Sequence, residues 1–393
     1  MPGFNRTHFD DLRGATRLAF DASTGITRLV GAVHGAIERT VVPFPSAANG
    51  DARGLAGLIY RGIGGGMRAL GTGIDAGLAP LGGLLPAGET SEARDAWVAV
   101  LNGVYGDHLA HTGNPLAIEM SLRHRGRAVD PRSPAMARLP ERNGSNGPRL
   151  LLLVHGLCMN DARWQREGHD HGAALADQLG YVPLYLRYNS GLRIADNGRV
   201  LARLLHDLLE QWPEPVTELA IIGHSMGGLV ARSAVHEAQR AGHAWPRRLS
   251  KLVFLGTPHL GAPLERGGHG LDYLLELSRY SAPFARIGRQ RSAGIRDLRH
   301  GTITAGEHQH VPLPVGVRCY AAAATLGSRR GPVAERLLGD GLVPLDSALG
   351  RHARPDRALE IPSERQWIGY QMGHLQLLNR PEVHAQLRDW LSD

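Results

Sequence analysis

The feature that most constrains the fold is a series of short apolar runs, without polar alternation, in the later part of the chain. They occupy residues 150–154, 182–186, 219–222, 252–255 and 315–324. Stretches with helical spacing, such as 199–212 and 229–240, lie between the first four runs. A strand without polar positions is buried on both faces, which is typical of a parallel sheet covered by helices. We therefore expect an α/β fold with a mostly parallel central sheet flanked by helices.

The N-terminal part has a different pattern. Residues 9–40 contain no proline and carry apolar side chains every three or four positions, which predicts an amphipathic helix. Proline and glycine interrupt this pattern at 43–51, and it resumes over 55–81. The two segments predict a helix hairpin, followed by a third helix over 91–111. The chain is thus expected to have an N-terminal helical region at 1–115 and an α/β domain at 116–393 that opens with a short hairpin.

Composition excludes several classes of protein. With 393 residues, of which 42% are hydrophobic and 21% charged, the chain can bury a large core and is not expected to be disordered. Cys158 and Cys319 are too few for a disulfide framework, and they fit a reducing compartment. The N-terminus has no continuous apolar segment that would predict a secretory signal. Residues 68–89 are rich in glycine and contain two prolines, so they do not predict a spanning helix. We expect a cytoplasmic protein.

The positive charge is localised. The net charge of +7 is carried almost wholly by arginine, since Lys251 is the single lysine. Residues 120–149 hold seven arginines against two acidic residues, whereas residues 1–119 hold nine against eleven. No basic and aromatic residues alternate as in a nucleic-acid reader, so no nucleic-acid partner is expected. The slightly acidic N-terminal helices favour contact with an uncharged lipid surface over an anionic membrane.

One five-residue motif stands between an apolar strand and a predicted helix. Gly223-His224-Ser225-Met226-Gly227 fits the G-x-S-x-G pattern and occurs once in the chain. A serine on a sharp strand-to-helix turn needs small residues two positions away on each side, because the two backbones pass close together. An ordinary glycine-rich turn is the alternative interpretation. The strand–turn–helix context favours Ser225 as a nucleophile.

A serine nucleophile needs a base and an acid further along the chain. His374 lies just before a predicted C-terminal helix and is the expected base, whereas His259 precedes any plausible acid and is interpreted as a loop-structuring histidine. Asp340, in a Gly-Asp-Gly turn, is the favoured acid. Asp346 and Glu360 are alternatives, and a turn aspartate that only caps its own backbone is the simplest competing interpretation.

The oxyanion hole is expected from two backbone N–H groups. One belongs to Met226, the residue after the nucleophile, and the other to Leu157, in the loop after the first apolar strand. Gly156 allows that loop to turn towards the site. Cys158 is interpreted as a packing residue, because no histidine-paired cysteine motif accompanies it.

These motifs together resemble the α/β-hydrolase superfamily, in particular its lipase-like branch of bacterial triacylglycerol lipases and GPI inositol-deacylase-like proteins. The resemblance covers about residues 116–393 and depends on five segments, at 154–156, 223–228, 256–261, 340–344 and 373–375. It implies carboxylic-ester hydrolysis through an acyl-enzyme, with Ser225, Asp340 and His374 as the catalytic triad. Bacterial lipases carry a calcium-binding aspartate where this chain has Gln376, so no calcium is expected, nor any other metal or cofactor.

Two segments have open interpretations. Residues 263–302 alternate large apolar side chains with arginines, which fits either a mobile cap over an acyl pocket or an ordinary pair of surface helices. The N-terminal helices are expected to pack on the hydrolase, to lie on a lipid surface as a peripheral contact, or to form an oligomer interface. The resemblance says nothing about them.

Three functions remain in competition. The first is a serine esterase or lipase that acts on an apolar or lipid-like ester. The second is an intracellular thioesterase or polyester depolymerase with the same triad. The third is a lipid-surface scaffold whose hydrolase domain is catalytically inert, which the presence of all three triad residues disfavours.

Overall fold

A computed structural model describes most of the chain. The described residues are 7, 10, 11, 13–15, 92–130, 147–262, 292–306, 310–328 and 339–392. The predicted helix hairpin over 9–40 and 55–81 lies almost entirely outside them, as do residues 263–291 of the predicted cap. Contact of the N-terminal helices with a lipid surface therefore stays a prediction. No helix in the described ranges is both long and apolar enough to cross a membrane.

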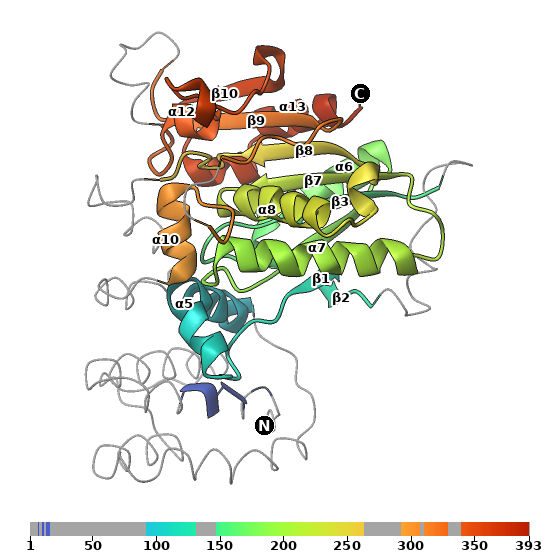
Figure 1. Ribbon diagram of the computed structural model, residues 1–393, viewed down its shortest axis with the longest axis vertical. Helices are drawn as coiled ribbons and strands as arrows, with labels where there is room; N and C mark the ends of the chain where they lie inside the picture. Colours follow the sequence, from blue (N-terminus) through green and yellow to red (C-terminus); the bar gives the residue numbers. More distant parts are fainter. Residues whose placement is uncertain are drawn as a thin grey trace.

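A single eight-stranded sheet organises the molecule, in the order β10-β9-β8-β7-β3-β6-β1-β2 (Figure 1). The strands from β3 to β10 in this sheet are parallel, and β1 and β2 form an antiparallel hairpin that pairs with β6. Their bounds are β1 Ser121–His124, β2 Arg127–Ala128, β3 Arg149–Val154, β6 Val182–Arg187, β7 Glu218–His224, β8 Leu249–Leu255, β9 Arg318–Thr325 and β10 Gln366–Tyr370. The prediction of a mostly parallel α/β fold is confirmed.

Each of the five predicted apolar runs overlaps a strand, although β9 begins three residues later than predicted, at Arg318. Strand β10 was not predicted. It is an edge strand, most of its residues are only half-buried, and its Gln-Trp-Ile-Gly-Tyr sequence lacks the apolar run of a central strand.

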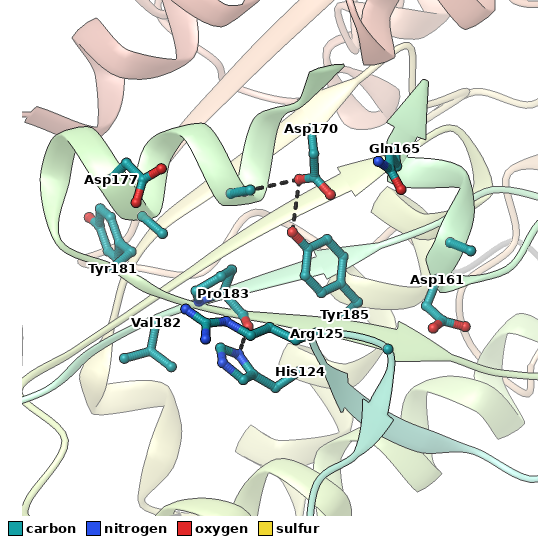
Figure 2. A pocket seen from close by; sticks show the side chains of 14 residues that line it. His124, Arg125, Asp161, Gln165, Asp170, Asp177, Tyr181, Val182, Pro183 and Tyr185 are labelled. Atoms are coloured by element: carbon teal, nitrogen blue, oxygen red, sulfur yellow. Dashed lines mark hydrogen bonds between the residues drawn. The ribbon is translucent and has the colours of Figure 1, made fainter. Parts of the chain in front are cut away.

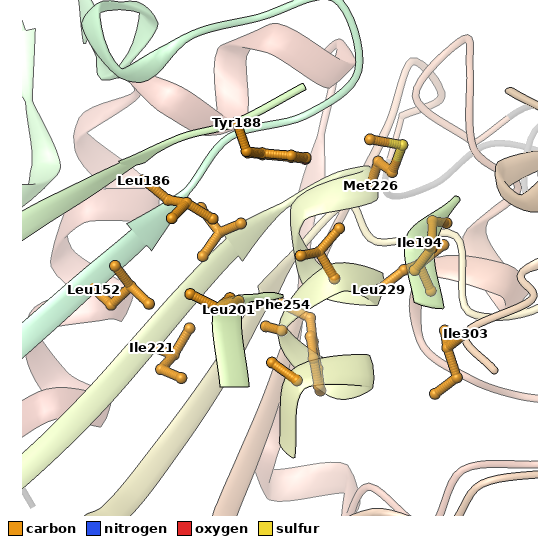
Figure 3. Close-up of a cluster of buried hydrophobic side chains, with 14 of the residues drawn as sticks. Leu152, Leu186, Tyr188, Ile194, Leu201, Ile221, Met226, Leu229, Phe254 and Ile303 are labelled. Carbon is orange, nitrogen blue, oxygen red and sulfur yellow. The ribbon is translucent and has the colours of Figure 1, made fainter. Parts of the chain in front are cut away.

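Alternate residues of the central strands feed two separate cores, because successive side chains of a strand point to opposite faces. In β3, Leu150, Leu152 and Val154 belong to one cluster, and Leu151 and Leu153 belong to the other. The first cluster packs against α7 (Ile194–Gln211) and α8 (Met226–Arg240), which cover one face of the sheet (Figures 1 and 3). The second packs against α6 (His171–Leu179) and α13 (Pro381–Ser392) on the opposite face.

Helix α5 (Glu92–His111) corresponds to the third predicted helix, and it shares the first core cluster with the sheet. It lies beside α10 (Ala293–His300) at one end of the sheet (Figure 1). The backbone carbonyl of Gly103 in α5 accepts a hydrogen bond from Ser292 Oγ at 2.7 Å. A Cβ atom at Gly103 would lie 2.3 Å from Cys158 Sγ, so α5 passes directly against the loop that follows β3.

Six short helices and one small hairpin complete the described ranges. The helices that bear on the site are η2 (Asp161–Trp164), α12 (Leu345–Ala348) and η7 (His374–Leu378). The hairpin pairs β4 (Gln165–Arg166) with β5 (His169–Asp170) and leads directly into α6. The remaining 3-10 turns are Trp245–Arg248, Pro355–Arg357 and Ser363–Arg365.

Candidate active site

Ser225 sits on the turn between β7 and α8 with a strained backbone. Its φ is 53° and its ψ is −125°, a combination that L-residues rarely adopt. The Ser225 N–H donates to Leu255 O at 2.8 Å, which fixes the turn to strand β8. The predicted need for small neighbours is evident, since a Cβ atom at Gly223 would lie 2.4 Å from Gly228 Cα and one at Gly227 would lie 2.1 Å from Val154 O.

His374 and Asp340 form the tightest polar contact near this turn. His374 Nδ1 lies 2.6 Å from Asp340 Oδ2, and both side chains are buried. The other carboxylate oxygen, Oδ1, accepts from the N–H groups of Leu342 at 3.0 Å and Val343 at 2.8 Å. The two oxygens of Asp340 thus accept from three N–H groups if His374 donates through Nδ1. This arrangement suits an ionised carboxylate and an imidazole protonated on Nδ1.

The imidazole of His374 lies beside the serine turn. A Cβ atom at Gly256, the residue after Leu255, would be 2.9 Å from His374 Cε1. The ring of His224, which precedes Ser225, has its centroid 4.7 Å from that of His374. The structure therefore places the His374–Asp340 pair beside the residues that flank Ser225, up to 149 positions away in the sequence.

The alternative candidates for the acid and the base are not part of the His374–Asp340 pair. Asp346 and Glu360 are both exposed, and neither is bonded to His374. His259 is buried against the ring of Phe254 at a centroid distance of 4.5 Å, and its Nδ1 lies 3.4 Å from Arg232 Nη1. Its position inside the protein agrees with its interpretation as a loop-structuring residue.

The two expected oxyanion donors flank the serine turn. Met226 is the first residue of α8, so its N–H belongs to the positive end of that helix. Leu157 lies in the loop after β3, where a Cβ atom at Gly156 would be only 3.1 Å from Ser225 Cβ. Within the described ranges, neither N–H has a hydrogen-bond acceptor.

Cys158 has a structural place in this loop. Its φ is +59°, and its N–H donates to Ser190 Oγ at 3.0 Å, a bond that nothing in the sequence around Ser190 signalled. Burial raises the pKa of its thiol to about 12, so the sulfur is not a thiolate near neutral pH. This agrees with the prediction that Cys158 is a packing residue.

Two further histidines next to the site are neutral. Burial lowers the pKa of His155 to about 4, and the ring stacks on Tyr188 at 4.3 Å. The pKa of His224 is also lowered well below its ordinary value, first by burial and then by the nearby charge of His374. Both imidazoles therefore support the loops of the site without adding positive charge at neutral pH.

A cavity of about 440 Å³ lies away from the serine turn, between α6, β6 and the β1–β2 hairpin (Figure 2). None of the predicted site residues lines it. Its lining includes Asp170, whose carboxylate accepts from Tyr185 Oη at 2.8 Å and from the Ala173 N–H at 3.0 Å. The predicted acyl pocket would be bounded by residues 263–291, which lie outside the described residues.

The chain matches one family model and is similar to several solved structures at low sequence identity. Residues 168–312 match the model of the PGAP1-like alpha/beta domain. No curated protein sequence matches the chain. Similar solved structures include the mature lipase BlEst2 of Bacillus licheniformis, with 18% identity, a TM-score of 0.42 and coverage of 64% of this chain and 95% of the lipase.

Two other solved structures are similar to this chain at low sequence identity. Lipase B of Aspergillus fumigatus is 14% identical, with a TM-score of 0.42 and coverage of 97% of this chain and 85% of the lipase. The RedJ thioesterase of Streptomyces coelicolor is 18% identical, with a TM-score of 0.36 and coverage of 68% and 97%. The fold assignment itself depends on the strand order and the serine turn described above.

Proposed function

We propose that this chain is an α/β hydrolase of the lipase and esterase branch and that it cleaves carboxylic esters of apolar or lipid-like substrates through an acyl-enzyme on Ser225. The observation that carries the proposal is the His374–Asp340 pair beside the strained turn of Ser225. A serine hydroxyl is a weak nucleophile unless a positioned base accepts its proton. The third group of a catalytic triad is a buried carboxylate that accepts a hydrogen bond from the base and orients it.

In the proposed reaction, Ser225 Oγ attacks the ester carbonyl while His374 Nε2 accepts the hydroxyl proton. Asp340 Oδ2 accepts the hydrogen bond from His374 Nδ1, which fixes the tautomer and stabilises the imidazolium. His374 then protonates the leaving alcohol. A water molecule attacks the acyl-enzyme with His374 again as the base, and Ser225 is released together with the free acid.

The developing oxyanion would be held by the backbone N–H groups of Leu157 and Met226. Backbone donors fixed in this way require no reorganisation during the reaction, and the α8 N-terminus adds a favourable dipole. The strain at Ser225 supports this assignment, because an unfavourable backbone conformation is retained only where surrounding structure enforces it.

Covalent labelling tests the serine nucleophile directly. A fluorophosphonate probe should label the wild-type protein once, and the label should be absent from Ser225→Ala. The control variant Ser363→Ala, which changes an exposed serine in a 3-10 turn, should be labelled like the wild type. Equal labelling of Ser225→Ala and the wild type would reject Ser225 as the nucleophile.

Turnover separates the enzyme from the inert scaffold and identifies the substrate class. We expect Ser225→Ala to lower ester hydrolysis by at least about 10³-fold. A panel of p-nitrophenyl esters of increasing acyl length, with acyl thioesters of the same lengths, then distinguishes an esterase from a thioesterase. Thioester cleavage at a higher kcat/KM than the matched esters would favour the alternative function, and no turnover of either class would favour the scaffold.

A further inference from the structure

Three histidines meet on the face of the sheet opposite to α7 and α8. His169 is in β5, His171 is the first residue of α6, and His384 is in α13. One ring nitrogen from each lies within 4.8 Å of the other two. His171 is buried and the other two are half-buried, so the cluster is at the edge of the protein interior.

Hydrogen bonds fix which nitrogen of two of these rings carries the proton. His171 Nε2 is 3.1 Å from the carbonyl oxygen of Leu377, and His384 Nε2 is 3.1 Å from Gln178 Oε1. Both oxygens can only accept, so both Nε2 atoms are protonated donors. The two Nδ1 atoms consequently carry lone pairs, and they face each other at 3.4 Å.

Two lone pairs at this separation are placed so that one cation can bind both nitrogens. Two ligands of a tetrahedral zinc ion with bonds of about 2.0–2.1 Å are about 3.3–3.4 Å apart. The His171–His384 separation already has this value. The third ring supplies His169 Nε2, which lies 2.8 Å from His171 Nδ1. On metal binding the His169 proton would move from Nε2 to Nδ1, and the Nε2 lone pair would bind the ion.

The backbone fixes the position of His169 independently of any ion. His169 follows a two-residue hairpin turn, Glu167-Gly168, in which both residues have positive φ. Asp170, between the two histidines, points to the opposite side, because its carboxylate is bonded to Ala173 N–H and Tyr185 Oη (Figure 2). The Asp170 carboxylate therefore already has its partners, and the three histidine nitrogens are the ligands that remain.

The chemistry of the three side chains agrees with this geometry. Neutral imidazoles are the form that binds a metal, and a set of three nitrogens suits zinc, whereas calcium and magnesium prefer oxygen.

We propose that His169, His171 and His384 bind a Zn²⁺ ion that links β5, α6 and α13. Gln178 and the carbonyl of Leu377 serve as positioning groups that orient two of the ligands. Leu377 belongs to η7, the turn that begins at His374, so the ion would also restrain the segment that carries the proposed base. The site does not depend on the proposed esterase activity.

Metal stoichiometry provides the test. The full chain, freed of any affinity tag and stripped with EDTA, is titrated with ZnCl₂ by calorimetry, and bound zinc is counted by elemental mass spectrometry after desalting. We expect one zinc per wild-type chain and a rise in Tm on zinc addition. X-ray absorption should find three nitrogen ligands and one oxygen at about 2.0–2.2 Å.

Variants separate this site from unspecific binding to the other histidines. His169→Gln and His384→Gln, both at half-buried positions, should weaken zinc binding by more than about 100-fold, and Gln178→Ala by about 10–100-fold. His243→Gln is the matched control, since His243 is half-buried and stacked on His206 at 4.6 Å. It should bind zinc like the wild type.

Three outcomes would overturn the proposal. The first is that the wild type binds no stoichiometric zinc. The second is that His384→Gln and His169→Gln bind zinc as tightly as the wild type. The third is that His243→Gln loses as much zinc affinity as these two variants. Circular dichroism of each variant confirms that it is folded before titration. Ser225→Ala should bind zinc unchanged, so failure of the esterase proposal and failure of the zinc proposal are observed separately.

Discussion

Asp340 and His374 are joined twice. The side chains meet through Nδ1 and Oδ2 at 2.6 Å, and the His374 backbone N–H donates to the Asp340 carbonyl at 3.2 Å. The backbone bond ties the Gly-Asp-Gly turn after β9 to the start of η7. The orientation of the imidazole is thus set by the chain as well as by the carboxylate, and this relationship makes the role of Asp340 testable.

Asp340→Asn should preserve the turn and impair catalysis. An asparagine Oδ1 can still accept from the Leu342 and Val343 N–H groups, so the free energy of unfolding should change little. The amide no longer stabilises an imidazolium and favours the wrong tautomer, for which a loss of about 10³–10⁴ in kcat is expected. Steady-state kinetics on an ester measures this. Asp346→Asn, at an exposed position, is the control and should retain activity; if both variants were equally active, Asp340 would not be the acid.

Gly256→Ala should displace the base. Gly256 has a φ of 58°, and an added Cβ would lie 2.9 Å from His374 Cε1. The control is Gly113→Ala: Gly113 has nearly the same φ, 59°, but an added Cβ atom there would meet nothing within 4 Å. Both variants should lose about 1 kcal/mol of stability from backbone strain. Only Gly256→Ala should also lose about 10–100-fold in kcat, as measured beside urea unfolding of both proteins.

Ser225→Gly and Ser225→Ala should differ in stability although both remove the hydroxyl. Glycine adopts the φ of 53° and ψ of −125° with little strain, whereas alanine retains the strain of the native serine. After the greater chain entropy of glycine is subtracted, Ser225→Gly should be the more stable by about 1 kcal/mol. Urea denaturation at pH 7 compares them, and a less stable glycine variant would show that this turn is not strained.

Acid should weaken the fold through buried neutral histidines such as His155. The unfolded chain protonates this residue near pH 6.5, whereas the folded chain holds its pKa at about 4. Between these values the unfolded state binds more protons, so the free energy of unfolding falls as the pH is lowered. The loss from His155 alone reaches at most about 3 kcal/mol near pH 4, and none arises above pH 6.5.

Urea titrations at pH 7, 6, 5 and 4.5 measure this slope. In His155→Asn the amide can still donate to the Gly156 carbonyl, which His155 Nδ1 contacts at 2.8 Å, but it cannot be protonated. Its free energy of unfolding should therefore depend less steeply on pH across this window. An unchanged slope would mean that His155 is protonated alike in both states.

The single lysine should be a stabilising internal group. Lys251 Nζ lies 3.1 Å from Glu218 Oε1 and 3.1 Å from the Leu391 carbonyl, and its side chain is buried. Glu218 also accepts from Arg149 Nε at 2.5 Å and Tyr181 Oη at 2.8 Å, so removal of the lysine leaves the carboxylate partnered.

Lys251→Met keeps the apolar stem and should cost about 1–2 kcal/mol. Lys251→Ala also leaves a cavity and should cost about 1–2 kcal/mol more. Thermal and urea unfolding rank the two variants. A methionine variant more stable than the wild type would indicate that the desolvation of the ammonium group outweighs its hydrogen bonds.

Local sequence determined the parts of this protein that depend on short-range pattern. The five apolar runs predicted the five central strands because burial on both faces removes polar alternation. Gly223, Gly227 and Ser225 predicted the strand-to-helix turn because only small residues fit where two backbones approach so closely. The candidate residues Asp340 and His374 followed from their chain order in turns, and the structure places them in contact.

Tertiary structure decided what no local pattern contains. Strand β10 exists because the edge of β9 offers free backbone groups, so a half-exposed segment with little strand signal pairs there. The sequence shows His169 and His171 two positions apart, but His384 reaches them only because α13 packs beside α6 across 213 residues. The sequence therefore determined the strands and the serine turn, whereas long-range packing decided which side chains each histidine contacts. The physical reason is that strand burial and turn strain depend on neighbouring residues, while the environment of a histidine depends on which distant elements the core brings together.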